Sequence, residues 1–214
     1  DYVDLSAQHT GVKFVQPIQG SDRCSVRFPY LKGKTWSEQL GEEIQGGKVP
    51  ADTVRTALEQ VLAVKTECVQ KFIVTPEFTE VFGEVESKEV WSSLSISNID
   101  ALFENILLTD DGMYCLDYEW VFLFPVPEHF VKYRILYYFY EQYSSVLKQL
   151  TLDQILGYFG ITPEMAEVYR RMEENFQSYV HGENQELYLG NYMVYSRTVR
   201  DIRQTESDLA RARE

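Results

Sequence analysis

The sequence has few cysteines and no long apolar run, and each shortage excludes a class of protein. Its cysteines are odd in number and lack paired spacing, so they indicate neither a disulfide framework nor a zinc site: Cys24, Cys68 and Cys115. No apolar run reaches the roughly 18 residues expected of a membrane-spanning helix. The start of the chain is polar and acidic, unlike a signal peptide. A reducing cytoplasm is therefore the expected location.

Positive charge is also scarce. The 214-residue chain has 20 Lys and Arg against 33 Asp and Glu, which gives a formal net charge of −13. This surplus argues against binding to nucleic acid or to an anionic membrane through overall charge. A nucleotide would need a local cation or metal ions in its site to offset the field. Aromatic residues are abundant, with 15 Tyr and 12 Phe, and they indicate the well-filled core of an ordinary globular protein.

Hydrophobic periodicity and capping residues predict an α+β chain that is mostly helical. Strands at 12–18 and 24–30 flank a turn and predict a hairpin, and three short strands are expected within 93–119. Residues 73–93 look irregular, with short strands around 79–85. Helices are expected at 35–44, 52–72, 129–147, 150–160 and 162–181. The first of these has a Thr35–Glu38 capping box, the second an Asp52 cap and the last a Thr162 cap.

The last segment, 183–214, is predicted to be a helix that changes character part-way. Its first residues are aromatic, whereas the rest is mostly charged, with Val199, Ile202 and Leu209 at coiled-coil spacing. The pattern leaves two alternatives open. One is a solvated helix end, and the other is the start of a coiled coil through which copies of the chain would form a homo-oligomer.

The stretch 98–119, NIDALFENILLTDDGMYCLDYE, places three polar side chains beside predicted strands. Asp100 and Asn105 are five residues apart before one apolar strand, and Asp117 ends the strand that returns after a tight turn. Phosphoryl transfer needs a carboxylate to orient or deprotonate the attacking hydroxyl, and oxygen ligands for magnesium. The order Asp, Asn, Asp supplies that carboxylate and two such ligands.

These residues resemble the catalytic and metal loops of the protein-kinase-like fold, in the branch of the aminoglycoside phosphotransferases and choline kinases. That branch has an H-x-D-x-x-x-x-N loop, followed by a hairpin that ends in Asp, an aromatic residue and Glu; Asp117, Tyr118 and Glu119 match this ending. The resemblance implies that Asp100 is the catalytic base. It implies that Asn105 and Asp117 bind magnesium and, with it, ATP. Glu119 would take the place of the branch's trailing Glu.

The resemblance covers about residues 12–180 and implies a kinase-like C-lobe with only a remnant of the N-lobe. It divides the chain into three parts, which are an N-lobe hairpin and hinge, the C-lobe, and a C-terminal helix extension: 1–34, 35–182 and 183–214. We expect the side chains of Asp100, Asn105 and Asp117 to surround one cleft that faces the hairpin 12–30.

Two departures from the family pattern affect the expected activity. Asn98 stands where the family has a His that mainly holds the loop in shape, so inactivity does not follow automatically. Nothing upstream of residue 12 can supply the Gly-rich loop, the strand Lys or its Glu partner, and Lys13 lies on the wrong strand. The three histidines are scattered, and we interpret them as surface or core residues rather than catalysts: His9, His129 and His181.

Two functions from different classes remain. The resemblance implies a phosphotransferase that moves a phosphate from ATP, with Mg²⁺, to a hydroxyl of a small molecule or glycan. The alternative is a catalytically inactive pseudokinase or scaffold module that links enzymatic domains of a multidomain protein. The chain begins with Asp rather than Met, so we expect it to be part of a longer protein. The order of its parts resembles that of bacterial surface-polysaccharide proteins, which implies a bacterial source. By itself, the 214-residue chain is expected to bind ATP–magnesium weakly or not at all and to show no phosphotransfer.

Overall fold

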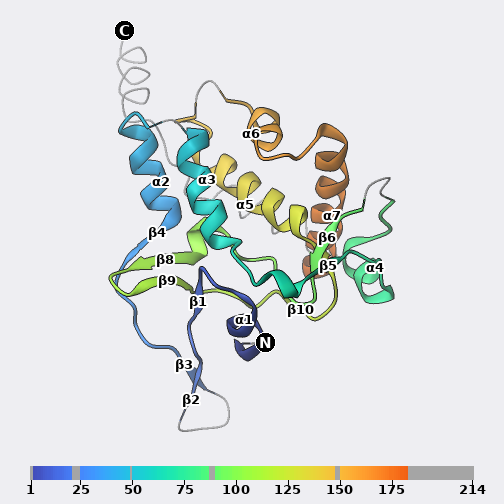
Figure 1. Ribbon diagram of the computed structural model, residues 1–214, viewed down its shortest axis with the longest axis horizontal. Coiled ribbons are helices and arrows are strands. Elements are labelled where there is room, and N and C mark those ends of the chain that lie inside the picture. Colours follow the sequence, from blue (N-terminus) through green and yellow to red (C-terminus); the bar gives the residue numbers. More distant parts are fainter. Residues whose placement is uncertain (1, 21–24, 49, 87–89, 148–149, 183–214) are drawn as a thin grey trace.

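Figure 1 shows the computed structural model of the chain, which describes residues 2–20, 25–48, 50–86, 90–147 and 150–182. Of the described residues, about 50% are helical and about 18% lie in strands, so the fold is α+β, as the sequence predicts. The predicted C-terminal helix at 183–214 lies outside the described residues. Among the helices that the structure describes, none has both the length and the apolar character needed to cross a membrane.

The described ranges contain seven α-helices. They are α1 (Tyr2–Gln8), α2 (Trp36–Gln45), α3 (Pro50–Val61), α4 (Pro76–Phe82), α5 (Glu128–Tyr143), α6 (Leu152–Tyr158) and α7 (Pro163–His181). The predicted capping box starts α2. The side chain of Thr35 accepts from the backbone N–H of Glu38, and the side chain of Glu38 accepts from the backbone N–H of Thr35. Thr162 caps α7 by accepting a hydrogen bond from the backbone N–H of Met165. Half of the residues of α5 are buried, as its apolar sequence predicts.

One helix prediction and one strand prediction are wrong. The helix expected at 52–72 begins at Pro50, so Asp52 is not its cap, and it ends at Val61. The chain then forms a short 3₁₀ helix and a strand, β5 (Val69–Lys71). The helical spacing of apolar residues continues in this part of the sequence, but the side chains of β5 are exposed. Where strands were expected around 79–85, α4 forms instead, because Thr75 caps its first turn and Pro76 has the fixed φ that suits a helix start.

Four small sheets are present in the described ranges. The largest has the order β1–β9–β8–β4, made of β1 (Lys13–Phe14), β9 (Gly112–Cys115), β8 (Ile106–Thr109) and β4 (Lys34–Thr35). The other three combine short strands with the orders β11–β6–β5, β10–β7 and β2–β3: β2 (Ile18–Gln19), β3 (Val26–Arg27), β6 (Ser92–Leu94), β7 (Ser97–Asn98), β10 (Val121–Phe122) and β11 (Val126–Pro127). The antiparallel hairpin β8–β9 confirms the predicted turn, in which Gly112 has a φ of 130° that favours glycine.

The hairpin predicted for residues 12–30 forms only in part. Ile18 pairs with Arg27 and Gln19 pairs with Val26, and this short hairpin, β2–β3, extends away from the rest of the molecule (Figure 1). The segment before it does not join that hairpin. Instead β1 pairs in parallel with β9. The first strand of the chain is therefore attached to the hairpin that precedes Asp117.

An aromatic cluster connects helices α4, α5 and α7 to strand β10, near the loop that carries Asp100. Phe82 of α4 is fully buried, and its ring centroid lies 5.3 Å from that of Phe130 on α5 and 6.0 Å from that of Phe176 on α7. The ring of Phe122 on β10 lies 5.2 Å away. The many aromatic residues therefore fill the core, as expected.

The capping box of α2 gives a test of the local fold. The substitution Thr35→Ala removes the oxygen that accepts from the backbone N–H of Glu38, and we expect it to lower the free energy of unfolding by about 1 kcal/mol. Urea denaturation measures this change. The control Thr10→Ala alters an exposed threonine outside any cap and should change it by less than about 0.5 kcal/mol. Equal effects of the two substitutions would mean that the box does not stabilise α2.

Candidate functional site

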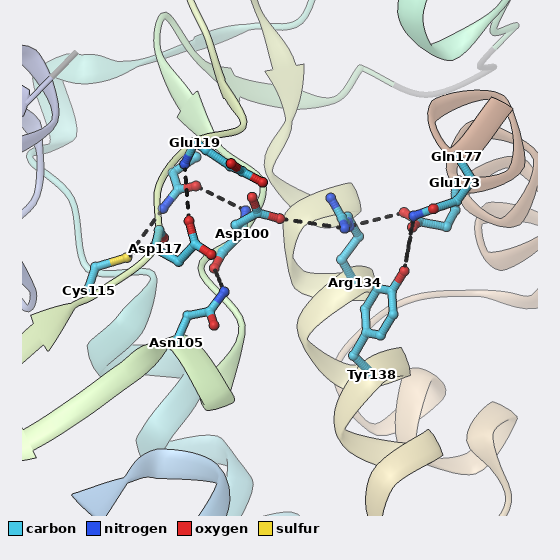
Figure 2. A network of polar contacts seen from close by, with 10 residues as sticks. Asp100, Asn105, Cys115, Asp117, Glu119, Arg134, Tyr138, Glu173 and Gln177 are labelled. Atoms are coloured by element: carbon cyan, nitrogen blue, oxygen red, sulfur yellow. Dashed lines mark hydrogen bonds and ion pairs between the residues drawn. The ribbon is translucent and has the colours of Figure 1, made fainter. Parts of the chain in front are cut away.

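A cleft of about 530 Å³ lies between the loop after β7, the chain that follows β9, and helices α5 and α7. The three predicted site residues, Asp100, Asn105 and Asp117, all line this cleft, and Figure 2 shows them close together. The expectation that the cleft faces the hairpin 12–30 is wrong in one respect. None of the described residues in that range lines the cleft, and its other wall is formed by α5 and α7.

Asn98 determines the shape of the loop that carries Asp100. Its side chain is buried, and its Oδ1 accepts a hydrogen bond of 3.0 Å from the backbone N–H of Asp100. Its Nδ2 donates to Sγ of Cys115 at the end of β9, over 3.5 Å. Asn98 therefore ties the loop to the neighbouring hairpin. A short polar side chain that bonds to the backbone two residues later is well suited to this task.

Asn105 and Asp117 present oxygen atoms to the cleft from either end of one hairpin, since Asn105 directly precedes β8 and Asp117 follows β9. Nδ2 of Asn105 donates to the backbone oxygen of Asp100 over 2.9 Å, which leaves Oδ1 as an acceptor for a ligand. The backbone N–H of Leu116 donates to the backbone oxygen of Asn105, and this bond places Asp117 beside it. The side chain of Asp117 is exposed, and its Oδ1 accepts a weak hydrogen bond of 3.4 Å from the backbone N–H of Glu119.

Asp100 has the buried environment expected of a proton acceptor. Only 8% of the residue is exposed, and burial raises the pKa of its carboxyl to about 6. The guanidinium of Arg134, 3.8 Å from the carboxylate, opposes this rise, while the charge of Asp117 adds to it. A carboxyl with a pKa near the working pH can both lose and accept a proton, which suits general base catalysis.

Cys115 lies beside the loop, but its thiol is not a reactive group. Burial raises the pKa of its thiol to about 12, so the thiol stays protonated at neutral pH. Its Sγ donates a hydrogen bond to the backbone oxygen of Asp117 over 3.0 Å. The residue therefore acts as a structural link in the turn that leads to Asp117.

Arg134 and Glu173 are two residues of the cleft that the sequence analysis did not predict. Arg134 of α5 and Glu173 of α7 are 3% and 7% exposed, and Figure 2 shows them facing each other. Nε of Arg134 lies 3.0 Å from Oε2 of Glu173, aligned as an ion pair rather than as a hydrogen bond. Oε1 of Glu173 accepts from the hydroxyl of Tyr138 over 2.7 Å and from Nε2 of Gln177 over 2.8 Å. A signal was present in the sequence, since each charge interrupts an otherwise apolar, core-facing pattern.

The cleft is acidic, so an anionic ligand needs a cation there. Arg134 is the one Lys or Arg among the described residues of the cleft. Carboxylates from several elements line the cleft: Asp100, Glu104, Asp117, Glu119, Glu141, Glu173 and Glu174. Within the described ranges, no three His, Cys, Asp or Glu side chains form a group that could hold a metal ion. Magnesium at phosphoryl-transfer sites is usually held by one or two carboxylates, waters and substrate phosphates. The oxygens of Asn105 and Asp117 fit this limited protein contribution.

Lys13 does not contribute to the cleft. Its Nζ donates to Oδ1 of Asp111 over 2.7 Å and lies 5.1 Å from the centroid of the Tyr114 ring. Both partners belong to the turn and second strand of the β8–β9 hairpin, on the side where β1 is paired. The lysine therefore stabilises the hairpin and leaves the cleft to the residues described above.

Comparison with known proteins adds nothing to the geometry of the cleft, which is defined by the side chains of this chain. No protein-family model matches the chain, and no curated protein or solved structure matches it either.

Proposed function

We propose that the chain belongs to a kinase-like phosphotransferase, which transfers a phosphate from ATP to a hydroxyl of a small molecule or glycan. One observation carries the proposal: Asp100, Asn105 and Asp117, placed before and after a single β-hairpin, converge on one cleft. A carboxylate with an elevated pKa beside two oxygen ligands is the arrangement that phosphoryl transfer needs. In this proposal, α2 to α7 form the C-lobe and β2–β3 is the remnant of the N-lobe.

Asp100 is the residue that handles the proton in this proposal. Its carboxylate accepts a hydrogen bond from the acceptor hydroxyl, orients the hydroxyl oxygen, and takes its proton as the new P–O bond forms. The bond between the γ-phosphorus of ATP and its bridging oxygen breaks in the same step, and ADP leaves with that oxygen. Asn98 and Asn105 hold the loop through hydrogen bonds to the backbone N–H and oxygen of Asp100. The backbone of Asp100 is therefore held by hydrogen bonds on both sides of its Cα atom.

Asn105 and Asp117 are the residues that would hold Mg²⁺. When bound, the ion would offset the charge of the nucleotide phosphates, which the acidic cleft does not offset by itself. The amide oxygen of Asn105 and the carboxylate of Asp117 supply hard oxygen ligands. The hydrogen bond from Asn105 to Asp100 keeps the base and the metal ligand at a fixed separation.

A binding experiment tests the proposed metal site without an identified acceptor. Mn²⁺ serves as a paramagnetic probe for Mg²⁺, and electron paramagnetic resonance measures its free concentration during titration with ATP. We expect ATP-dependent Mn²⁺ binding by the chain alone to be weak, and Asp117→Asn should weaken it further by at least about tenfold, because a charged ligand becomes neutral.

The variant Asp110→Asn is the matched control. It removes the same charge from the turn of the same hairpin, but Asp110 does not line the cleft, so binding should stay within about twofold. Loss of Mn²⁺–ATP binding in both variants alike would point to overall charge instead of a site. ATP-dependent Mn²⁺ binding that Asp117→Asn leaves unchanged would contradict the proposal and favour a non-catalytic scaffold module.

A further inference from the structure

A second cavity, of about 180 Å³, lies behind the loop that carries Asp100. It is enclosed by the end of α1, the segment after α3, strands β6 and β7, and the first turns of α5. It shares no lining residue with the acidic cleft, although Asn98 and Ala101 of the loop form part of its wall. The cavity is therefore a separate space that touches the opposite side of the same loop.

Most of the wall is apolar, and its size sets the size of a ligand. The apolar side chains come from four separate segments: Leu62, Val64, Leu94, Ala101 and Val131. An apolar cavity of about 150 Å³ is large enough to bind benzene. A molecule with one six-membered ring and a small substituent therefore fits the space.

Two buried polar side chains in the wall have no hydrogen-bond partner within the protein. Ser97 is 2% exposed and its Oγ is unpaired, and both ring nitrogens of His9 are buried and unpaired. The segments that carry the two residues are joined, because Nε2 of Gln8, which precedes His9, donates a 2.8 Å hydrogen bond to the backbone oxygen of Ile96, which precedes Ser97. Buried polar groups are usually paired, and each unpaired one destabilises the fold. A ligand hydroxyl, which both donates and accepts, would pair them.

The charges around the cavity favour a neutral ligand. Burial lowers the pKa of His9 to about 4, so its imidazole is neutral at pH 7 and offers one donor and one acceptor. Glu128 and Lys132 lie one turn apart on α5 and have opposite charges, so they present no net charge to the cavity. An ion would lose its hydration without gaining a counter-charge.

We propose that this cavity binds a neutral, single-ring molecule with one hydroxyl group, whose apolar ring contacts the wall and whose hydroxyl bonds to Ser97 and His9. The site is independent of the phosphotransferase proposed above, since its ligand does not enter the acidic cleft. Phenol is the probe that represents this chemistry, and toluene is its counterpart without the hydroxyl.

Titration of the ¹⁵N-labelled chain with each probe, followed by heteronuclear NMR, tests the proposal. We expect saturable binding of phenol with a Kd of about 1 mM or tighter, as its few heavy atoms allow. The shifted amide signals should include those of His9, Ser97 and Ala101. The variant Ser97→Ala should weaken phenol by about 2- to 10-fold, because one hydrogen bond is lost, and leave toluene unchanged.

Two further variants serve as controls. Ser93→Ala removes another buried, unpaired hydroxyl, but Ser93 does not line the cavity, so the binding of both probes should stay the same. Leu62→Trp fills the space from a partly buried position and should abolish the binding of both. Phenol that fails to saturate, binds equally to Leu62→Trp, or loses affinity equally in Ser93→Ala and Ser97→Ala would overturn the proposal.

Discussion

The substitution Glu173→Gln should lower the free energy of unfolding by about 3 kcal/mol, because it leaves the guanidinium of Arg134 buried without its closest counter-charge. The exchange is nearly isosteric. The amide oxygen can still accept the hydrogen bonds that Tyr138 and Gln177 now donate to Glu173. The change therefore removes charge while it keeps shape, and urea denaturation at pH 7 measures its effect.

Glu174→Gln is the matched control, one residue further along α7. Glu174 is exposed and pairs with Arg170 on the surface, where an ion pair contributes about 1 kcal/mol or less. A double variant, Arg134→Met with Glu173→Gln, removes both buried charges and should be more stable than Glu173→Gln alone. If Glu173→Gln costs no more than Glu174→Gln, the buried pair does not stabilise the packing of α5 against α7.

The same pair connects the stability of the fold to the candidate site. Nη2 of Arg134 lies 3.8 Å from Oδ1 of Asp100, so one guanidinium faces two carboxylates from different parts of the chain. Without this positive charge, burial would raise the pKa of Asp100 further, since Arg134 opposes the rise more strongly than the hydrogen bond from the backbone of Trp120 does. Helix α5 therefore does more than cover the cleft: it supplies the positive charge that keeps a buried carboxylate ionisable.

The part of the site that the sequence predicted lies within one short stretch with strong local signals. Asp100, Asn105 and Asp117 flank a hairpin whose turn, Thr109 to Gly112, is apparent from its residues. Local signals also predicted α2 and α7 through their caps. The start signal of α4, Thr75 followed by Pro76, was equally present, so its omission was an error of interpretation rather than a missing signal.

Other features had no local signal. The pairing of β1 with β9 involves two-residue strands that are distant in the sequence, and such short strands carry no detectable periodicity. Arg134 and Glu173 meet only because α5 packs against α7, and neither residue indicates its partner from its own surroundings. The end of α3 at Val61 depends on β5 pairing with β6, which overrides the helical spacing that continues in the sequence. Tertiary contacts decided all three features.

Acid should destabilise the fold through His9 well above the pH at which most carboxylates titrate. Burial lowers the pKa of His9 to about 4 in the folded state, against 6.5 for the exposed side chain. The unfolded chain therefore binds a proton at a higher pH than the folded chain does. The stabilisation is fully present above pH 6.5 and is lost as the pH falls from 6.5 toward 4.

Between pH 7 and pH 5, this linkage should lower the free energy of unfolding by about 2 kcal/mol. Asp100 acts in the opposite direction over this range, because burial raises the pKa of its carboxyl to about 6 and the folded chain therefore binds a proton more readily than the unfolded chain. Urea denaturation at the two pH values therefore gives the His9 contribution as the difference between the unmodified chain and His9→Phe, which keeps an aromatic ring beside Phe14 without a titratable nitrogen. The control His181→Gln changes a histidine at the far end of α7 and should keep the full pH dependence. A His9→Phe variant that loses as much stability as the unmodified chain between pH 7 and pH 5 would show that the imidazole is not held neutral by burial. It would also mean that the nitrogens of His9 reach solvent or a partner, in contrast to their unpaired position beside the cavity.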